Sequence, residues 1–358
     1  MISAHPNEIV FLSGGTEANN MVLNMFKCQQ KLQNGYGAGD EVVKLPHIIT
    51  SSIEHVSITK PLEKLRDDGL VEVTFVDVDK TTHAIRVEDV LQAIQPQTTL
   101  ISLMLANNET GVLQPVKELS EKLRPYQHSN RKIYLHTDAC QAIGKIPVSV
   151  KDLSVDYLTI AGHKFYGPRI GALYVRGLGH CNGAPLQPMI LGGGQENGYR
   201  AGTENVAMIV GLGKASELVS SNIHSYQSQL LSVRDYLEDS LQQKFGSLIH
   251  FNAKSSDSTR LPNTCNFSLV GKRFLGRAIL QHCKVIIAGV GAACHSNAIV
   301  ASPILLNSGI PSDIAVNAIR LSVGIKTSFA DIDVAVEDIW NAYQAIAHPK
   351  SHSQSTEQ

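Results

Sequence analysis

Short apolar runs alternate with helix-like segments over residues 8–175, and this alternation constrains the fold more than any other feature of the chain. Several of the runs are continuously apolar, as is typical of strands that are buried on both faces of a sheet. Helical segments between successive strands favour parallel pairing, because each helix can return the chain to the starting edge of the sheet. The sequence therefore predicts an α/β fold with strands at residues 9–13, 47–51, 71–76, 100–106, 133–137, 157–161 and 172–175.

The chain has 358 residues, which is more than one hydrophobic core usually holds, so we expect two domains. Residues 1–206 form the predicted large domain, with helices expected at 17–31 and 115–123. A long amphipathic stretch at 207–245 leads into the predicted smaller domain, residues 207–348, and residues 349–358 are expected to form a polar tail. In the smaller domain the sequence predicts an α+β arrangement, with strands at 264–269 and 285–288 and helices at 276–282, 313–319 and 332–346.

Charge and cysteine content exclude several classes of function. The formal net charge is −1 and no block is rich in lysine and arginine, so neither nucleic acid nor a membrane surface is an expected partner. The longest apolar stretch, residues 285–294, is interrupted by glycine and is too short to span a bilayer. Six scattered cysteines without a Cys-x-x-Cys pair argue against a zinc site and a disulfide framework, and the N-terminus lacks the features of a signal peptide. We expect a cytosolic protein without a metal site.

Two of the predicted strands end in side chains that could hold the two ends of one aromatic cofactor. Asp138 follows the run at 133–137, and Lys164 follows the run at 157–161. A lysine amine can form a Schiff base with pyridoxal phosphate (PLP), and an acid can keep the ring nitrogen of that cofactor protonated. Taken alone, Asp138 would more simply be a helix N-cap and Lys164 a solvated side chain.

Three further loops after predicted strands carry groups that are useful to PLP. Gly15 and Thr16 open a helix, and the N-terminus of a helix favours a phosphate group, although a plain β-α turn explains them equally well. His55 could stack on an aromatic ring, and Asn108 lies in an Asn-Asn-Glu-Thr-Gly turn at a strand end, where α/β sheets usually bind ligands. The glycine loops match neither the dinucleotide nor the nucleoside-triphosphate motif. Together these loops favour a PLP site.

Two residues of the predicted smaller domain also attract attention. Cys294 lies in a Gly/Ala-rich segment beside His295, where a partly exposed thiol could be a nucleophile. A free cysteine is more commonly a small buried hydrophobic residue, and the spacing leaves both interpretations open. Arg320 is a lone arginine among apolar residues, so it could pair with a structural carboxylate or bind the carboxylate of a substrate.

Seven motifs, in their order and spacing, resemble those of the NifS-like class V aminotransferase family. They are Ser-Gly-Gly-Thr-Glu-Ala-Asn-Asn, Ser-Ser-Ile-Glu-His, Asn-Asn-Glu-Thr-Gly, His-Thr-Asp-Ala-Cys-Gln, Gly-His-Lys, Arg-x-Gly-Thr-Glu-Asn and Arg-Leu-Ser-Val-Gly. The resemblance extends over residues 7–333. It implies a PLP-dependent enzyme of fold type I, with a large domain built on a mostly parallel sheet and a smaller α+β C-terminal domain. It also implies a homodimer with active sites at the subunit interface, and a chain that lacks the usual N-terminal segment of the family.

The resemblance assigns a role to each residue of the cofactor site. Lys164 binds the cofactor as a Schiff base and then moves the Cα proton, Asp138 pairs with the pyridinium nitrogen, and His55 stacks on the ring. Gln141 and Asn108 are expected to reach the phenolic oxygen. The phosphate is expected to contact Gly15, Thr16 and His163 of one subunit. It is also expected to contact Thr203, which comes from the partner subunit. Ala161 stands where many members have a phosphate-binding serine, which implies one phosphate contact fewer.

The segments 162–179, 261–268 and 291–296 are most similar to the animal enzymes of this family that cleave selenocysteine. The implied activity is a PLP-dependent lyase reaction that converts L-selenocysteine into L-alanine and reduced selenium. Arg320 would bind the substrate carboxylate, Cys294 would protonate or capture the selenium, and a protein such as selenophosphate synthetase could accept it. Two alternatives remain: a cysteine desulfurase that supplies sulfur through a Cys294 persulfide, and a truncated, catalytically weak or silent homologue with a binding role.

The role of Cys294 gives a first testable prediction. Selenolate is a better leaving group than thiolate, so selenocysteine needs less help from Cys294 than cysteine does. We expect Cys294→Ala to abolish turnover of cysteine and to spare part of the turnover of selenocysteine, measured as alanine release from each amino acid. An equal loss on both substrates would contradict this prediction.

Overall fold

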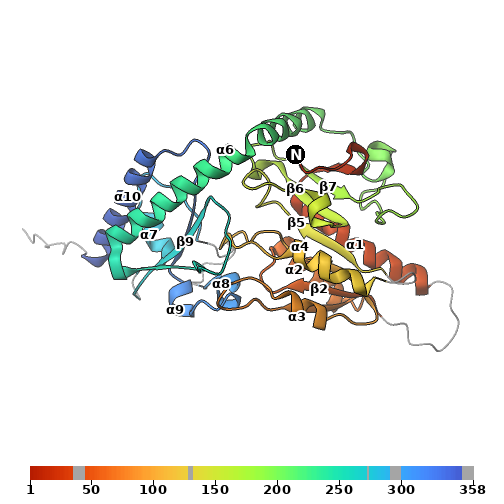
Figure 1. The fold of residues 1–358 in the computed structure, drawn as a ribbon, viewed down its shortest axis with the longest axis horizontal. Coiled ribbons are helices and arrows are strands. Elements are labelled where there is room, and N and C mark those ends of the chain that lie inside the picture. The colour runs from red at the N-terminus through yellow and green to blue at the C-terminus, as the bar shows by residue number, and fades with distance from the viewer. Residues whose placement is uncertain (35–44, 128–131, 272–273, 291–299, 349–358) are drawn as a thin grey trace, which may run out of the picture. The chain divides into compact units, whose positions relative to one another are not determined.

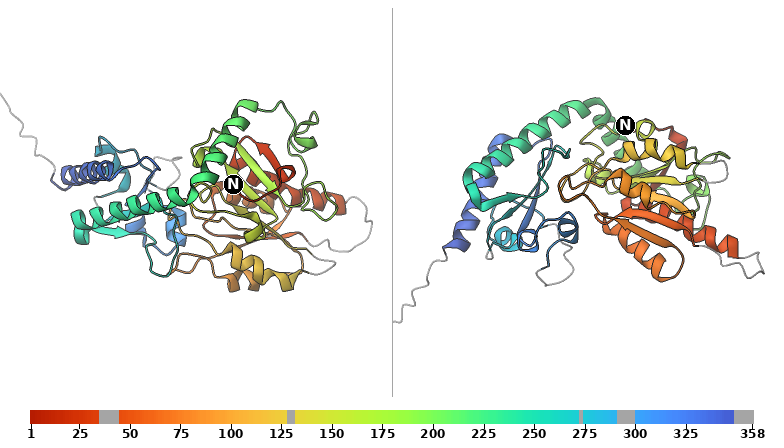
Figure 2. Two further views of the ribbon diagram at one scale, coloured as in Figure 1. Left: turned by 45° about the horizontal axis from the view of Figure 1, so that its top comes forward. Right: turned by 60° about the horizontal axis from the view of Figure 1, so that its bottom comes forward.

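The polypeptide divides into two compact units in the computed structural model, which describes residues 1–34, 45–127, 132–271, 274–290 and 300–348 (Figures 1 and 2). Unit 1 consists of Met1–Asn108, Val112–Gln227 and Ser258–Leu261, and unit 2 consists of Glu109–Gly111, Ser228–Asp257 and Pro262–Gln358. Helix α6 (Val206–Phe245) contributes residues to both units, and unit 1 gives way to unit 2 within it, between Gln227 and Ser228.

A seven-stranded sheet forms the centre of unit 1, with the strand order β1-β7-β6-β5-β4-β2-β3. The five strands from β6 to β3 in this order are parallel, whereas β7 pairs antiparallel with β6 and β1 pairs antiparallel with β7. The mostly parallel α/β sheet expected from the sequence is therefore confirmed. The strands are β1 (Ile9–Leu12), β2 (His47–Ser51), β3 (Glu72–Val76), β4 (Thr98–Ser102), β5 (Tyr134–Asp138), β6 (Tyr157–Ala161) and β7 (Gly171–Val175).

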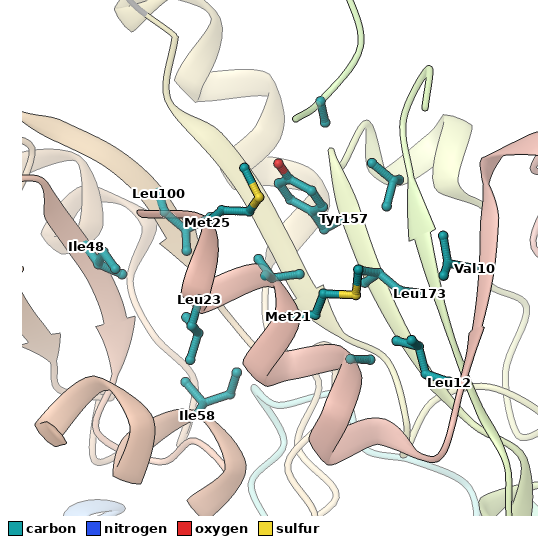
Figure 3. Close-up of a cluster of buried hydrophobic side chains, with 14 of the residues drawn as sticks. Val10, Leu12, Met21, Leu23, Met25, Ile48, Ile58, Leu100, Tyr157 and Leu173 are labelled. Atoms are coloured by element: carbon teal, nitrogen blue, oxygen red, sulfur yellow. The ribbon is translucent and has the colours of Figure 1, made fainter. Parts of the chain in front are cut away.

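Helices join the strands of unit 1 and bury its apolar residues against the sheet. Met21 and Leu23 project from the first long helix into a cluster with Ile58, Tyr157 and Leu173 (Figure 3). Burial of such large apolar side chains is the main favourable contribution to folding of the unit. The helices are α1 (Gly15–Asn34), α2 (Val56–Asp67), α3 (Val87–Gln92), α4 (Val116–Leu123) and α5 (Val150–Leu153), with short 3-10 turns at Pro6–Glu8, Arg124–Tyr126, Gly162–Lys164 and Gln195–Gly198.

Unit 2 is built on an antiparallel sheet with the order β10-β9-β8. Its core includes Phe267 from the central strand and an aromatic group in which Trp340 stacks on Tyr343 at a centroid distance of 5.4 Å. The elements are β8 (Ile249–Phe251), β9 (Thr264–Leu269), β10 (Ala318–Ser322), α7 (Gly276–His282), α8 (Pro303–Asn307), α9 (Ser312–Ala315) and α10 (Phe329–Ala347), with a 3-10 turn at Gly246–Leu248.

Two sequence predictions for unit 2 are wrong. Residues 285–288 form no strand, because the backbone N–H groups of Lys284, Val285 and Ile286 donate to the carboxylate of Asp338 instead of to a neighbouring strand. The helix predicted at 313–319 ends after one turn as α9, and the chain then enters β10. Both segments are short and apolar, and for such segments tertiary contacts override the local pattern.

Candidate active site

A pocket with a volume of about 170 Å³ lies in unit 1, where the carboxyl ends of β2, β4, β5 and β6 meet the first turn of α1. Parallel strands end at the same edge of a sheet, and this edge is where α/β proteins usually bind ligands. The structure brings eight of the predicted site residues together in its wall. These are Gly15, Thr16, His55, Asn108, Asp138, Gln141, His163 and Lys164.

Asp138, the last residue of β5, is fixed in the pocket wall by two hydrogen bonds. The side-chain amide of Asn19 on α1 donates to Oδ2 at 2.8 Å, and the backbone N–H of Cys140 donates to Oδ1 at 2.9 Å. The residue is 9% exposed. A carboxylate that accepts these two hydrogen bonds cannot rotate without losing them, so its orientation in the pocket is fixed.

His55 is placed by its position at the N-terminus of α2. Its Nδ1 accepts from the backbone N–H of Ser57 at 3.2 Å, so a neutral ring carries its proton on Nε2. Asn19 also donates to the hydroxyl of Ser57, which connects His55 to Asp138 through two side chains. Burial lowers the pKa of His55, while the charges of Asp138 and Lys164 act in opposite directions. The imidazole ring of His55 is therefore neutral and is held in one orientation in the pocket wall.

Glu54, which precedes His55, is a second buried carboxyl group close to the pocket. Its Oε1 accepts from the hydroxyl of Ser51 at 2.6 Å and from the backbone N–H of Met104 at 2.9 Å. Burial raises the pKa of Glu54 to about 8 despite these hydrogen bonds, and the charge of Asp138 acts in the same direction as burial. At neutral pH Glu54 is therefore mostly protonated and adds little negative charge beside Asp138.

Two other titratable groups beside Asp138, the buried His136 and the half-buried Cys140, are also kept neutral. His136 bridges three strands, with Nδ1 2.8 Å from the hydroxyl of Ser102 and Nε2 3.0 Å from the hydroxyl of Thr159. Burial lowers the pKa of His136 to about 4, so the ring carries no charge. Burial also raises the pKa of the Cys140 thiol well above its usual range, so the thiol stays protonated.

Lys164 ends the 3-10 turn Gly162–Lys164 that follows β6, and its exposed side chain lines the pocket. The turn requires glycine at position 162, because a Cβ there would lie 2.7 Å from the carbonyl oxygen of Pro168. Phe165, the next residue, is only 1% exposed and anchors the turn in the core. The Gly-His-Lys motif thus holds one lysine at the sheet edge with a fixed backbone.

The first turn of α1 closes the pocket on another side. Gly15 and Thr16 line it, and the first N–H groups of a helix have no partner within the helix. A Cβ on Gly15 would lie 2.9 Å from the sulfur of Cys140, so this position has no room for a side chain. Ala161 also lines the pocket and offers no hydroxyl group. This turn can bind an anion through its backbone and the hydroxyl of Thr16.

The donor set of the pocket fits a planar aromatic ring that carries an aldehyde and a phosphate. It supplies an amine (Lys164), an acid (Asp138), a neutral imidazole (His55) and a helix N-terminus. The Oδ1 atom of Asn19 is buried and finds no hydrogen-bond partner among the residues described here, so the wall retains an acceptor for a bound molecule.

The remaining predicted site residues lie elsewhere. Thr203 lines a different cavity of unit 1, together with Ser13, Arg169 and Arg200. Cys294 lies outside the described residues. Arg320 belongs to β10 of unit 2, where it pairs with Asn266 on β9.

Arg320 has a defined environment within unit 2. The backbones of Arg320 and Gly289 form an antiparallel bridge, with an N–H to carbonyl distance of 2.7 Å, and a Cβ on Gly289 would lie 3.2 Å from the guanidinium. Glu109 is 3% exposed, and burial raises its pKa to about 7, opposed by a hydrogen bond from Ser302 and by the charge of Arg320. The charge of Arg320 therefore acts on a buried carboxyl group of the same unit.

The sequence analysis missed several residues that line the pocket. Asn19 could have been found from its spacing, because it lies four and three residues after Gly15 and Thr16 and shares their helix face. The others carry no such signal, since only the folded chain brings them to the pocket. They are Ser57, Met104, Ala106 and Cys140.

The described part of the chain contains neither a metal-binding cluster nor a helix that could span a membrane. No group of three or more histidine, cysteine, aspartate or glutamate side chains in that part could hold a metal ion. Nor does the structure contain, over the same residues, a helix that combines the length and the apolar character needed to cross a membrane.

Residues 1–334 match the family model described as aminotransferase class-V, so the chain belongs to this family. It is 50% identical over 354 residues to the selenocysteine lyase of Bos taurus, covering 96% of this chain and 80% of the relative. It is 38% identical over 339 residues to the cysteine desulfurase IscS of Clostridium botulinum, covering 94% and 79%. A solved structure of a NifS-like protein matches with a TM-score of 0.77 at 29% identity, covering 95% of this chain and 84% of that chain. These findings confirm the predicted family and fold, and PLP is the cofactor of the family.

The raised pKa of Glu54 predicts how stability depends on pH. Between its usual value of 4.5 and about 8, folded Glu54 keeps a proton that the unfolded chain has lost, so rising pH destabilises the fold by up to about 1.4 kcal/mol per pH unit. Glu54→Gln does not titrate and keeps an oxygen acceptor. We expect the variant to gain stability over the wild type as pH rises from 5 to 8, measured by urea unfolding.

The exposed residue Glu121 offers a matched control on α4. Glu121→Gln should leave the pH dependence of unfolding as it is in the wild type. If the stability difference between Glu54→Gln and the wild type were the same at pH 5 and pH 8, the buried carboxyl group would not behave as described.

Proposed function

We propose that this protein is a PLP-dependent selenocysteine lyase, which converts L-selenocysteine into L-alanine and reduced selenium. One observation carries the proposal: Lys164 and Asp138 lie in one pocket of a chain that is 50% identical to a selenocysteine lyase over nearly its whole length. A lysine amine and an acid on opposite sides of one pocket are the two groups that PLP chemistry requires from a protein. The alternative of a catalytically silent homologue loses support, because eight of the residues predicted to bind the cofactor line this one pocket.

Bound PLP supplies an electron sink for the substrate carbon that loses its proton. Lys164 would hold the cofactor through its amine, and the same amine would take the proton from Cα of the substrate and return it to Cα when alanine forms. Asp138 keeps a proton on the ring nitrogen, and the hydrogen bonds from Asn19 and Cys140 hold its carboxylate in place for this task. His55 stacks on the ring with its neutral imidazole.

The other residues of the pocket orient the cofactor. Gly15, Thr16 and His163 hold the phosphate at the N-terminus of α1, and Asn108 and Gln141 reach the phenolic oxygen. Thr203 does not line this pocket, and we assign it to the phosphate site of the partner subunit. The absent hydroxyl at Ala161 leaves the backbone of α1 with a larger share of the phosphate contacts.

Unit 2 supplies the groups that act on the substrate. Arg320 binds the substrate carboxylate bidentately, and the absence of a side chain at Gly289 leaves room beside its guanidinium. Cys294 would capture the selenium: its sulfur bonds to selenium as the Cβ–Se bond breaks, the electron pair stays with Cβ, and Cβ takes a proton to give alanine. A thiol reductant would then release the captured selenium as selenide to an acceptor protein such as selenophosphate synthetase.

A cysteine desulfurase is the second candidate, and the 38% identity to the cysteine desulfurase IscS of Clostridium botulinum favours it. In that case Cys294 would carry sulfur as a persulfide. Alanine release from cysteine and from selenocysteine separates the two candidates. A desulfurase should release alanine from cysteine at a rate comparable with that from selenocysteine, whereas a selenocysteine lyase should favour selenocysteine. The cytosol is the proposed location, which agrees with the lack of a disulfide among the four cysteines that the structure describes.

The function is tested by replacement of Lys164. Lys164→Ala should lower alanine and selenide release from selenocysteine by more than about 100-fold, because it removes the group that moves the Cα proton. Borohydride should attach a pyridoxyl group to Lys164 in the wild type, and mass spectrometry should find no such label in the variant. Lys151→Ala, which changes an exposed lysine, should be active. A wild-type protein that binds no PLP and releases no alanine would overturn the proposal.

NifS-like PLP enzymes are typically dimers, and we propose a homodimer for this chain with the active sites at the subunit interface. Leu191 is 82% exposed, Met189 and Ile190 before it are also exposed, and the carbonyl of Ile190 accepts from the N–H of Ala201, shortly before Thr203. An exposed apolar segment beside the Thr203 loop is a suitable contact for a second copy.

The dimer predicts a mass of about twice 38.8 kDa in analytical ultracentrifugation. Leu191→Asp should shift the population toward monomer, because it places a charge in the proposed contact. Val334→Asp changes an exposed valine of α10 and should leave the dimer intact. A wild-type monomer at micromolar concentration would contradict the proposed assembly.

A further inference from the structure

A buried lysine lies next to the turn that carries Lys164 and has no part in the chemistry proposed above. Lys145 is 8% exposed and does not line the cofactor pocket. The titratable groups that face it are Lys164 and Cys140, and neither is a carboxylate. Burial of an amine without an acidic partner is costly, so a lysine at this position needs another source of stabilisation.

The partner of Lys145 is the backbone of Lys164. Its Nζ donates a hydrogen bond to the carbonyl oxygen of Lys164 at 3.1 Å. The preceding residue makes a second contact with the same turn: Gly144 has a φ of +80°, and a Cβ there would lie 2.4 Å from Cβ of Phe165. Lys145 and Gly144 therefore contact two successive residues: Lys145 donates a hydrogen bond to the carbonyl of Lys164, and Gly144 packs closely against the side chain of Phe165.

The same short segment begins at Asp138. Two tight turns lead from Asp138 to Lys145, closed by hydrogen bonds from Ala142 N–H to the Ala139 carbonyl (3.0 Å) and from Lys145 N–H to the Ala142 carbonyl (3.1 Å). One end of segment 138–145 thus provides the acid of the pocket, and the other end holds the backbone of the pocket lysine. The segment thus links the two groups through a short stretch of chain.

We propose that Lys145 is a positioning residue for Lys164: by holding the Lys164 carbonyl, it sets the direction in which the Lys164 amine enters the cofactor pocket. The proposal rests on the proposed function, because it concerns the same lysine. Correct orientation of a reacting group accelerates a reaction without any new contact to the substrate. Loss of the hydrogen bond should leave the fold in place and make the Lys164 amine slower to bond to the cofactor.

The environment of Lys145 supports a dependence on pH. Burial lowers the pKa of Lys145 to about 8, and the positive charge of Lys164 acts in the same direction, while Cys140 raises it. The ammonium form, which donates the stronger hydrogen bond, is therefore present below about pH 8 and is lost above it. A lysine that only fills space would show no such dependence.

The test measures formation of the bond between Lys164 and PLP, not turnover. Apoprotein is mixed with PLP, samples are reduced with borohydride at set times, and mass spectrometry quantifies the pyridoxyl label on the peptide that contains Lys164. Lys145→Met removes the hydrogen bond and keeps the length of the side chain, and Lys145→Arg restores a cationic donor. Lys151→Met, an exposed lysine six residues further along the chain, is the matched control.

We expect Lys145→Met to slow labelling of Lys164 by about tenfold or more below pH 8, with a smaller difference at pH 9. Lys145→Arg should recover most of the rate, and Lys151→Met should equal the wild type. Equal labelling of wild type and Lys145→Met at every pH would overturn the proposal, as would a deficit that is independent of pH and is not rescued by arginine.

Two controls keep the result interpretable. Thermal unfolding of each apoprotein reports whether the fold is retained, and Lys145→Gln, which is too short to reach the carbonyl, replaces Lys145→Met if that variant fails to fold. Absence of label on Lys164 in the wild type would instead reject the proposed function. Failure of the positioning role and failure of the cofactor assignment are therefore separate outcomes.

Discussion

The two hydrogen bonds to the carboxylate of Asp138 are the constraint on which the rest of the pocket depends. One comes from Asn19 on α1 and the other from the backbone of Cys140, so they tie the end of β5 to the helix that presents Gly15 and Thr16. Asn19 also donates to Ser57, which positions His55. One amide group therefore links three walls of the pocket, and a shift of Asp138 would move all of them.

Charge around Asp138 is limited by burial rather than by pairing. Glu54, His136 and Cys140 could each carry a charge, yet their shifted pKa values keep all three mostly neutral near pH 7. Two neighbouring carboxylates would compete for one cationic ring, whereas a protonated Glu54 leaves Asp138 as the acid that faces it. The pocket thus offers one negative group and one amine, which matches a cofactor with one basic ring nitrogen and one aldehyde.

Much of this arrangement could be predicted from the sequence, because strand ends in a parallel sheet converge. Asp138 and Lys164 follow buried apolar runs, so their place at one edge follows from topology alone. Asn19 and Ser57 could not be assigned in this way, since their roles depend on side-chain hydrogen bonds between residues 38 and 119 positions apart. The strand predicted at 285–288 failed for a similar reason: the Asp338 carboxylate takes the backbone N–H groups that a neighbouring strand would need.

Segment 138–145 connects the acid of the pocket to the turn that carries the lysine. The motif His-Thr-Asp-Ala-Cys-Gln places Asp138 and Gln141 in the pocket. The segment then continues to Gly144 and Lys145, which contact Phe165 and Lys164. Because Asp138 and Lys145 are joined by only a few residues in two tight turns, a shift of Asp138 would also disturb the hydrogen bond from Lys145 to Lys164. The contacts that place the acid and the turn of the lysine are therefore all made within unit 1.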